Sequence, residues 1–181
     1  MIWRLLIALV GAGWLAAGCG EEAAPAPPAS RPAGGAPQLP TRAQPKLRTI
    51  KLWLGPEEMS AEMAVTAEQI TTGMMFRTNI ADNAGMLFLF PKPSQPAFWM
   101  KNCPLPLSAA FMDPSGTILE LHDFEAFNTN PVPAMSSNVQ YVLETSHGWF
   151  EQHHIRSGML VRTEFGSFPE TFIARRKVPV R

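Results

Sequence analysis

Apolar and polar residues alternate with a period of two along much of the chain that follows residue 48. In Thr49–Leu54, Ile50, Leu52 and Leu54 share one face, as in a half-buried β-strand. The pattern predicts strands over residues 49–54, 59–65, 85–90, 97–101, 107–112, 117–123, 138–144 and 159–165. Two of these, 85–90 and 97–101, are nearly continuous apolar runs, and we expect them to be buried on both faces.

Turn and helix-capping signals separate these strands. Asp113-Pro-Ser-Gly116 has the residues of a type I turn and predicts a hairpin. Thr66-Ala-Glu-Gln69 is a capping box and predicts a short helix over Ala67–Met75. Ser146 can cap a second helix that runs to about His153. Many short strands with one or two short helices indicate a mainly β domain.

The first eighteen residues have the pattern of an export signal. Arg4 precedes an apolar stretch that is too short to span a membrane, and Leu15-Ala-Ala-Gly-Cys19 ends it. The small residues before Cys19 resemble a bacterial lipoprotein signal, although Ala16 stands where leucine is usual. We therefore expect residues 1–18 to be removed and Cys19 to be acylated. The alternative is an ordinary signal peptide, with Cys19 incidental.

Residues 19–47 are rich in Pro and Ala, and predict a disordered tether that cannot bury a core. We place one folded domain at 48–168 and a basic, solvated tail at 169–181. Acylated Cys19 would anchor the protein to a membrane of the bacterial cell envelope. Gly20 is not the aspartate that often signals retention in the inner membrane, and this favours the outer membrane.

The charge balance argues against one class of partner. The chain has 15 Lys and Arg residues against 15 Asp and Glu residues. A formal net charge of zero does not suit a protein that binds nucleic acid by neutralising phosphates. We therefore expect no nucleic-acid partner.

Several short motifs, in order and spacing, resemble the family called domain of unknown function 192. They are Gly73-Met-Met-Phe-Arg77, Gly85-Met-Leu-Phe-Leu-Phe-Pro91, Phe98-Trp-Met-Lys-Asn102, Pro106-Leu107, Tyr141-Val-Leu-Glu144 and Gly148-Trp149. The resemblance spans about Met59 to Arg162. It implies a compact, jelly-roll-like antiparallel β-sandwich, commonly exported. It implies no reaction, because none is established for the family.

Three positions depart from the family pattern. Cys103 stands where threonine is usual, Ser108 where aspartate follows Pro-Leu, and Met159 where aspartate follows glycine. If those aspartates serve a shared chemistry, this chain lacks it.

The candidate site residues combine charge, an aromatic ring and an amide within apolar segments. They are Arg77, Trp99, Lys101, Asn102 and Glu144. A lone charge in a dry core is costly, so Lys101 and Glu144 need water or a partner. They could pair with each other or with Arg77 as structural clamps. Alternatively, the set lines a pocket in which Trp99 stacks on a saccharide-like or anionic ligand.

Other reactive residue types do not form a recognisable site. Cys103 has no motif relation to any histidine that could act as its base. His153 and His154 are adjacent, so their side chains diverge on a helix and suit no single metal ion. The methionines fall in apolar runs, where Met usually fills a core. We expect no cofactor and no metal.

These observations favour a binding or accessory module of the cell envelope for a small polar ligand, rather than an enzyme. One alternative is a cofactor-independent envelope enzyme that uses Glu144 or Asp123. The other is a structural protein that docks on a larger envelope assembly. A deep pocket favours the first two readings, and a broad exposed apolar patch favours the third.

Overall fold

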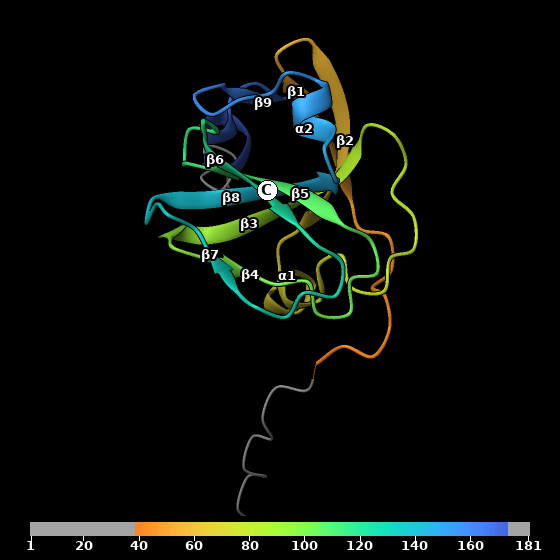
Figure 1. The fold of residues 1–181 in the computed structure, drawn as a ribbon. Helices are drawn as coiled ribbons and strands as arrows, with labels where there is room; N and C mark the ends of the chain where they lie inside the picture. Colours follow the sequence, from red (N-terminus) through yellow and green to blue (C-terminus); the bar gives the residue numbers. More distant parts are fainter. Residues whose placement is uncertain (1–38, 174–181) are drawn as a thin grey trace, which may run out of the picture. The chain divides into compact units, whose positions relative to one another are not determined.

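The computed structural model describes residues 39–173, which fold mainly as β-strands (Figure 1). The signal, Cys19, most of the tether and the end of the basic tail lie outside these residues. The strands are β1 Thr49–Leu54, β2 Glu57–Ala64, β3 Ala84–Ser94, β4 Ala97–Phe98, β5 Leu107–Met112, β6 Ile118–Phe124, β7 Val132–Pro133, β8 Val139–Ser146 and β9 Val161–Thr163. The helical elements are α1 Ala67–Thr72, α2 Trp149–Gln152 and a π-helical turn at Pro169–Ile173.

Seven of the strands form one curled sheet in the order β6-β5-β8-β3-β2-β1-β9. Its pairs are antiparallel except for β2 and β3, which are parallel. A parallel pair needs a crossover connection, and α1 with the turn after it provides one. The sheet curls until its edges meet, where the Ile118 amide donates to the Met159 carbonyl at 2.9 Å.

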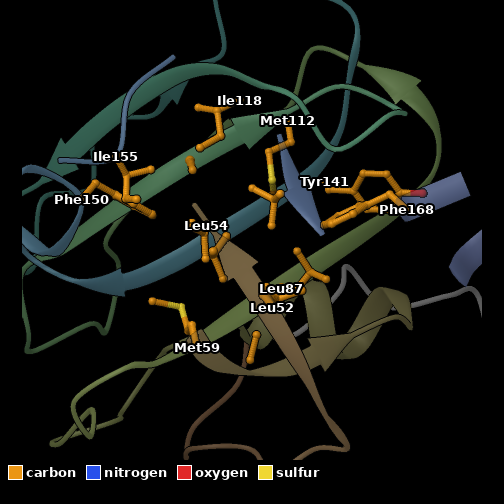
Figure 2. Close-up of a cluster of buried hydrophobic side chains, with 14 of the residues drawn as sticks. Leu52, Leu54, Met59, Leu87, Met112, Ile118, Tyr141, Phe150, Ile155 and Phe168 are labelled. Carbon is orange, nitrogen blue, oxygen red and sulfur yellow. The ribbon is translucent and has the colours of Figure 1, made fainter. Parts of the chain in front are cut away.

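The concave face of this sheet encloses the main core. Figure 2 shows the side chains that meet there, among them Leu52, Leu54, Leu87 and Tyr141. They come from β1, β3 and β8, because strand alternation turns every second residue inward. Phe168, which follows β9, closes this core against Tyr141 with a centroid distance of 4.8 Å.

The opposite face of the sheet is also buried, beneath α1 and two long loops. The loops pair through the two-stranded sheet β4–β7, and the Met100 amide donates to the Asn128 carbonyl at 2.7 Å. Their second core contains Met86, Phe88 and Phe111 from the sheet, with Met75 and Met100 from the covering segments. Burial on both faces explains why every residue of β5 is buried.

The mainly β fold class, with short helices, is confirmed. The hairpin formed by β5 and β6 is confirmed, and Asp113 accepts the amides of Ser115 and Thr117 in its turn. The capping box is also confirmed, with Thr66 and Gln69 bonded reciprocally. The jelly-roll arrangement of two facing sheets is not confirmed.

Two local predictions were wrong. The expected buried strand 97–101 is a strand only at Ala97–Phe98, because the chain then turns and Asn102 takes a positive φ of 59°. Ser146 does not cap α2, because its backbone still pairs with Leu107 at the end of β8. The helix begins after Gly148, which has no side chain with which to cap it.

Among residues 39–173, no helix is long and apolar enough to cross a membrane.

Candidate functional site

A cavity of about 260 Å³ lies between the outer face of the sheet and the segments that cover it. Four of the sequence motifs converge here. The cavity is lined by Ile70, Thr71, Thr72, Gly73, Met74, Met75, Phe88, Phe90, Pro96, Ala97, Phe98, Trp99, Cys103 and Glu144. Most of these side chains are apolar, and four are aromatic. Its polar side chains are Thr71, Thr72, Cys103 and Glu144, and of these Glu144 alone carries a carboxyl.

Gly73 shapes one wall of the cavity. It ends α1 with a φ of 46°, and its amide donates to the Gln69 carbonyl at 2.8 Å. A Cβ atom at this position would lie 3.2 Å from the ring of Phe88. The glycine thus permits both the left-handed backbone and the close approach of this turn to β3.

Asn102 joins two motifs rather than lining the cavity. Its carbonyl accepts the Phe76 amide at 2.7 Å, and its side-chain nitrogen lies 4.0 Å from the Met75 sulfur. These contacts hold the segment that follows Gly73 beside the one that carries Trp99 and Cys103. Asn102 is therefore a positioning residue for the cavity wall.

Glu144 lies on β8, between Met86 of β3 and Ala109 of β5. The residue is only 4% exposed, and within the part of the chain that the structure describes its carboxyl makes no hydrogen bond or ion pair. Burial raises its pKa to about 8. Desolvation penalises the charged form, so the group is mainly a neutral acid at pH 7.

Cys103 is the second titratable group in the cavity lining. Burial, and then the nearby carboxylate of Glu144, raise the pKa of its thiol to about 12. The thiol is thus protonated at neutral pH, whereas a nucleophilic cysteine needs its thiolate form. Such a pKa argues against a nucleophile at this position.

Arg77 does not join the other candidate residues. Its guanidinium Nη2 lies 2.9 Å from the Glu62 carboxylate, which also accepts the Leu47 amide at 2.7 Å. Arg77 lines a different hollow of about 220 Å³, together with Lys46. Its Nε is buried without a partner among residues 39–173. Arg77 therefore pairs with Glu62 and not with Glu144, the clamp partner that was one alternative from sequence.

Lys101 and Trp99 do meet, although both lie beyond the end of β4 and not on one face of a strand. The Lys101 ammonium lies 5.3 Å from the centroid of the Trp99 ring, in a cation–π contact. Trp99 is 37% exposed and lines the cavity, so its ring lies at the boundary between cavity and solvent. Lys101 does not line the cavity and forms no ion pair with Glu144.

A second hollow, of about 480 Å³, contains the other carboxylate considered from sequence, Asp123. The Ser108 hydroxyl donates to Asp123 and accepts the Gly148 amide at 2.8 Å. The Ser108 hydroxyl and the Asp123 carboxylate thus each have a partner, whereas the Glu144 carboxyl has none among the described residues. Over residues 39–173, no group of three His, Cys, Asp or Glu residues could hold a metal ion.

Sequence reasoning missed the enclosing residues of the cavity. The sequence pattern placed Phe98 and Met75 in the core. It marked Cys103 only as a departure from the family pattern. A further missed pair is Glu120 and His122, 2.8 Å apart, in which Glu120 also accepts the amides of Met135 and Ser136. A run of apolar residues does not reveal which of them will border a void.

The fold and the cavity describe a mainly β domain in which a buried acid borders a small cavity. Residues 51–163 match the model of the family DUF192, described as "uncharacterized ACR". This match covers more than half of the chain, so the chain belongs to the DUF192 family, and the resemblance seen in its motifs is confirmed.

Two crystal structures are similar to this chain. One, described as a candidate transcription regulator from Sinorhizobium meliloti 1021, is 25% identical with a TM-score of 0.63, over 67% of this chain and 98% of that one. The other, a protein of unknown function from Novosphingobium aromaticivorans DSM 12444, is 26% identical with a TM-score of 0.58, over 71% of this chain and 99% of that one. No curated protein matches the chain.

Proposed function

We propose that this protein is a small-ligand-binding module of the bacterial cell envelope, and that its site is the Glu144 cavity. One observation carries the proposal: a buried carboxyl without a partner faces a cavity built from four of the family motifs. The Glu144 oxygens are not among the fully buried atoms of residues 39–173 that lack a partner, so they are open to the cavity, where a ligand can hydrogen-bond to them. An aromatic side chain at the rim, Trp99, supplies a flat surface for the rest of the ligand.

The size and lining of the cavity limit the ligand. Its 260 Å³ lies just below the ~300–1,000 Å³ of typical small-molecule sites, so a small molecule or one group of a larger one would fill it. A saccharide ring could stack on Trp99 and hydrogen-bond to Glu144. An anion has less support, because Arg77 is engaged by Glu62 in another hollow and Lys101 lies outside the lining.

The envelope location is supported by the sequence alone, through the lipoprotein-type signal that ends at Cys19. Acylation of this cysteine would anchor the domain to a membrane, with the outer membrane favoured. Mass spectrometry of the mature protein tests this point. A mature N-terminus at Cys19 carrying acyl chains supports it, and an unmodified N-terminus elsewhere contradicts it.

A second function is an enzyme in which Glu144 acts as a general acid. A carboxyl with a pKa of about 8 keeps its proton at pH 7 and can deliver it to a leaving group. Turnover by the full-length protein that is lost in Glu144→Gln, with binding retained, would favour this function over simple binding.

The binding function can be tested by thermal unfolding of the full-length protein in a non-ionic detergent. A panel of envelope saccharides, amines and carboxylates would be compared on the native protein, Trp99→Ala and Trp53→Ala. Trp53 lies on β1 and does not line the cavity, so it is the matched control. A ligand at one hundred times its Kd should add about 2.7 kcal/mol of stability. Loss of this shift in Trp99→Ala alone supports the site, and equal shifts in all three proteins contradict it.

A further inference from the structure

We infer that the ligand of the Glu144 cavity carries an alkylammonium group, held between the Glu144 carboxylate and the aromatic side chains of the lining. This inference rests on the proposed binding function and narrows its ligand class.

The charges of the lining select against anions. Among the residues that the structure describes, no Lys, Arg or His borders this cavity. The titratable groups that do border it, Glu144 and Cys103, are both acids, and can be only neutral or negative. Lys101, the nearby cation, lies over Trp99. An anion would therefore enter without a counter-charge, whereas a cation would find an unpartnered carboxyl.

The aromatic side chains favour a cation for a second, independent reason. Phe88, Phe90, Phe98 and Trp99 line the same cavity as Glu144. Phe98 packs edge-on against Phe88, with centroids 5.2 Å apart, and against Phe90 at 6.5 Å. Aromatic faces attract ammonium groups, most strongly where water is excluded. Trp99 already contacts the Lys101 ammonium, so a ligand cation would lie against the phenylalanine rings of the lining.

Binding of a permanent cation would exchange a proton. In the empty cavity burial keeps Glu144 mainly protonated at pH 7, since its pKa is about 8. When an ammonium group enters, the carboxyl releases its proton to solvent, and the two opposite charges remain in the cavity. Cys103 keeps its proton, because burial raises its pKa to about 12. The affinity for a permanent cation should therefore increase as pH rises toward 8, by up to about tenfold per pH unit.

The experiment compares pairs of molecules that differ in charge but not in shape. Choline is paired with 3,3-dimethylbutan-1-ol, in which carbon replaces the nitrogen, and butylammonium is paired with butan-1-ol. Binding to the full-length protein is measured by calorimetry at pH 6, 7 and 8, in two buffers of different ionisation enthalpy. We expect at least one ammonium ion to bind about tenfold more tightly than its neutral partner, with proton release.

Two variants make the result specific. Glu144→Gln keeps the shape of the side chain but cannot become charged, and should remove the preference for ammonium and its pH dependence. Glu58→Gln removes a carboxylate on β2 that does not line the cavity, and should keep both. Neutral alcohols that bind as tightly as the ammonium ions would overturn the ammonium inference and leave the binding function standing. If none of the four probes binds, the ammonium inference is wrong. The thermal unfolding experiments with saccharides then test the binding function separately.

Discussion

Glu144→Gln should change how the stability of this protein depends on pH. Burial raises the pKa of Glu144 from its ordinary value of 4.5 to about 8. Between these values the folded protein holds a proton that the unfolded chain has released. Rising pH therefore favours the unfolded chain, and the free energy of unfolding decreases across this window. At 1.36 kcal/mol per pKa unit, the decrease attributable to Glu144 is at most about 5 kcal/mol.

The glutamine variant removes this linkage, because its amide cannot ionise. At pH 5 it should differ little from the native protein, and at pH 9 it should be more stable by several kcal/mol. Urea denaturation at five values between pH 5 and pH 9 measures the difference directly. Subtracting the free energy of unfolding of the native protein from that of the variant cancels the contributions of the groups that the two proteins share. A difference that stays constant over this range would refute the assignment of a buried, unpartnered acid.

Three further changes test other parts of the structure. Gly73→Ala forces a side chain into a left-handed conformation and against Phe88 of β3, and should lower stability by about 1–3 kcal/mol in thermal unfolding. Gly158→Ala is the control. It is also at positive φ, but a Cβ atom there would have nothing within 4 Å, so this substitution should cost less stability. Glu120→Gln should cost about 1–3 kcal/mol near pH 7. Burial alone would raise the pKa of Glu120, but its hydrogen bonds to His122 and two backbone amides lower that pKa overall. The stability lost in Glu120→Gln should therefore shrink as pH falls below 4.5. A loss of stability that does not change with pH would contradict this account. Thr66→Ala removes the capping box and should cost about 1 kcal/mol, whereas Thr66→Ser should retain most of it.

The strands that alternate clearly could be predicted from sequence, because their pattern reflects one buried face. Ile50, Leu52 and Leu54 are buried in β1 as expected. The apolar run at 97–101 has no such period, so nothing in it distinguishes a strand from a covering loop. Its course depends on the turn at Asn102 and on pairing with β7, more than thirty residues away.

The candidate site could be predicted only in part, for a similar reason. Glu144 and Trp99 stood out because each interrupts an apolar segment, and both line one cavity. Arg77 could not be assigned to its own partner, Glu62, because that contact depends on how the crossover between β2 and β3 returns to the sheet. Local sequence identifies unusual residues, but the path of the chain decides which of them meet.

The described end of the Pro-rich segment has a mechanical consequence. The Gln44 side chain donates to the carbonyls of Gln69 and Gly73, at 3.2 and 2.9 Å, and these residues belong to α1 and the cavity wall. The same Gln44 nitrogen also lies 3.7 Å from the sulfur of Met86 on β3, so if the protein is anchored through Cys19, tension on the tether reaches α1, the cavity wall and the sheet through one side chain. A pull on the anchor would thus load the helix, the cavity wall and β3 together, through the contacts of Gln44.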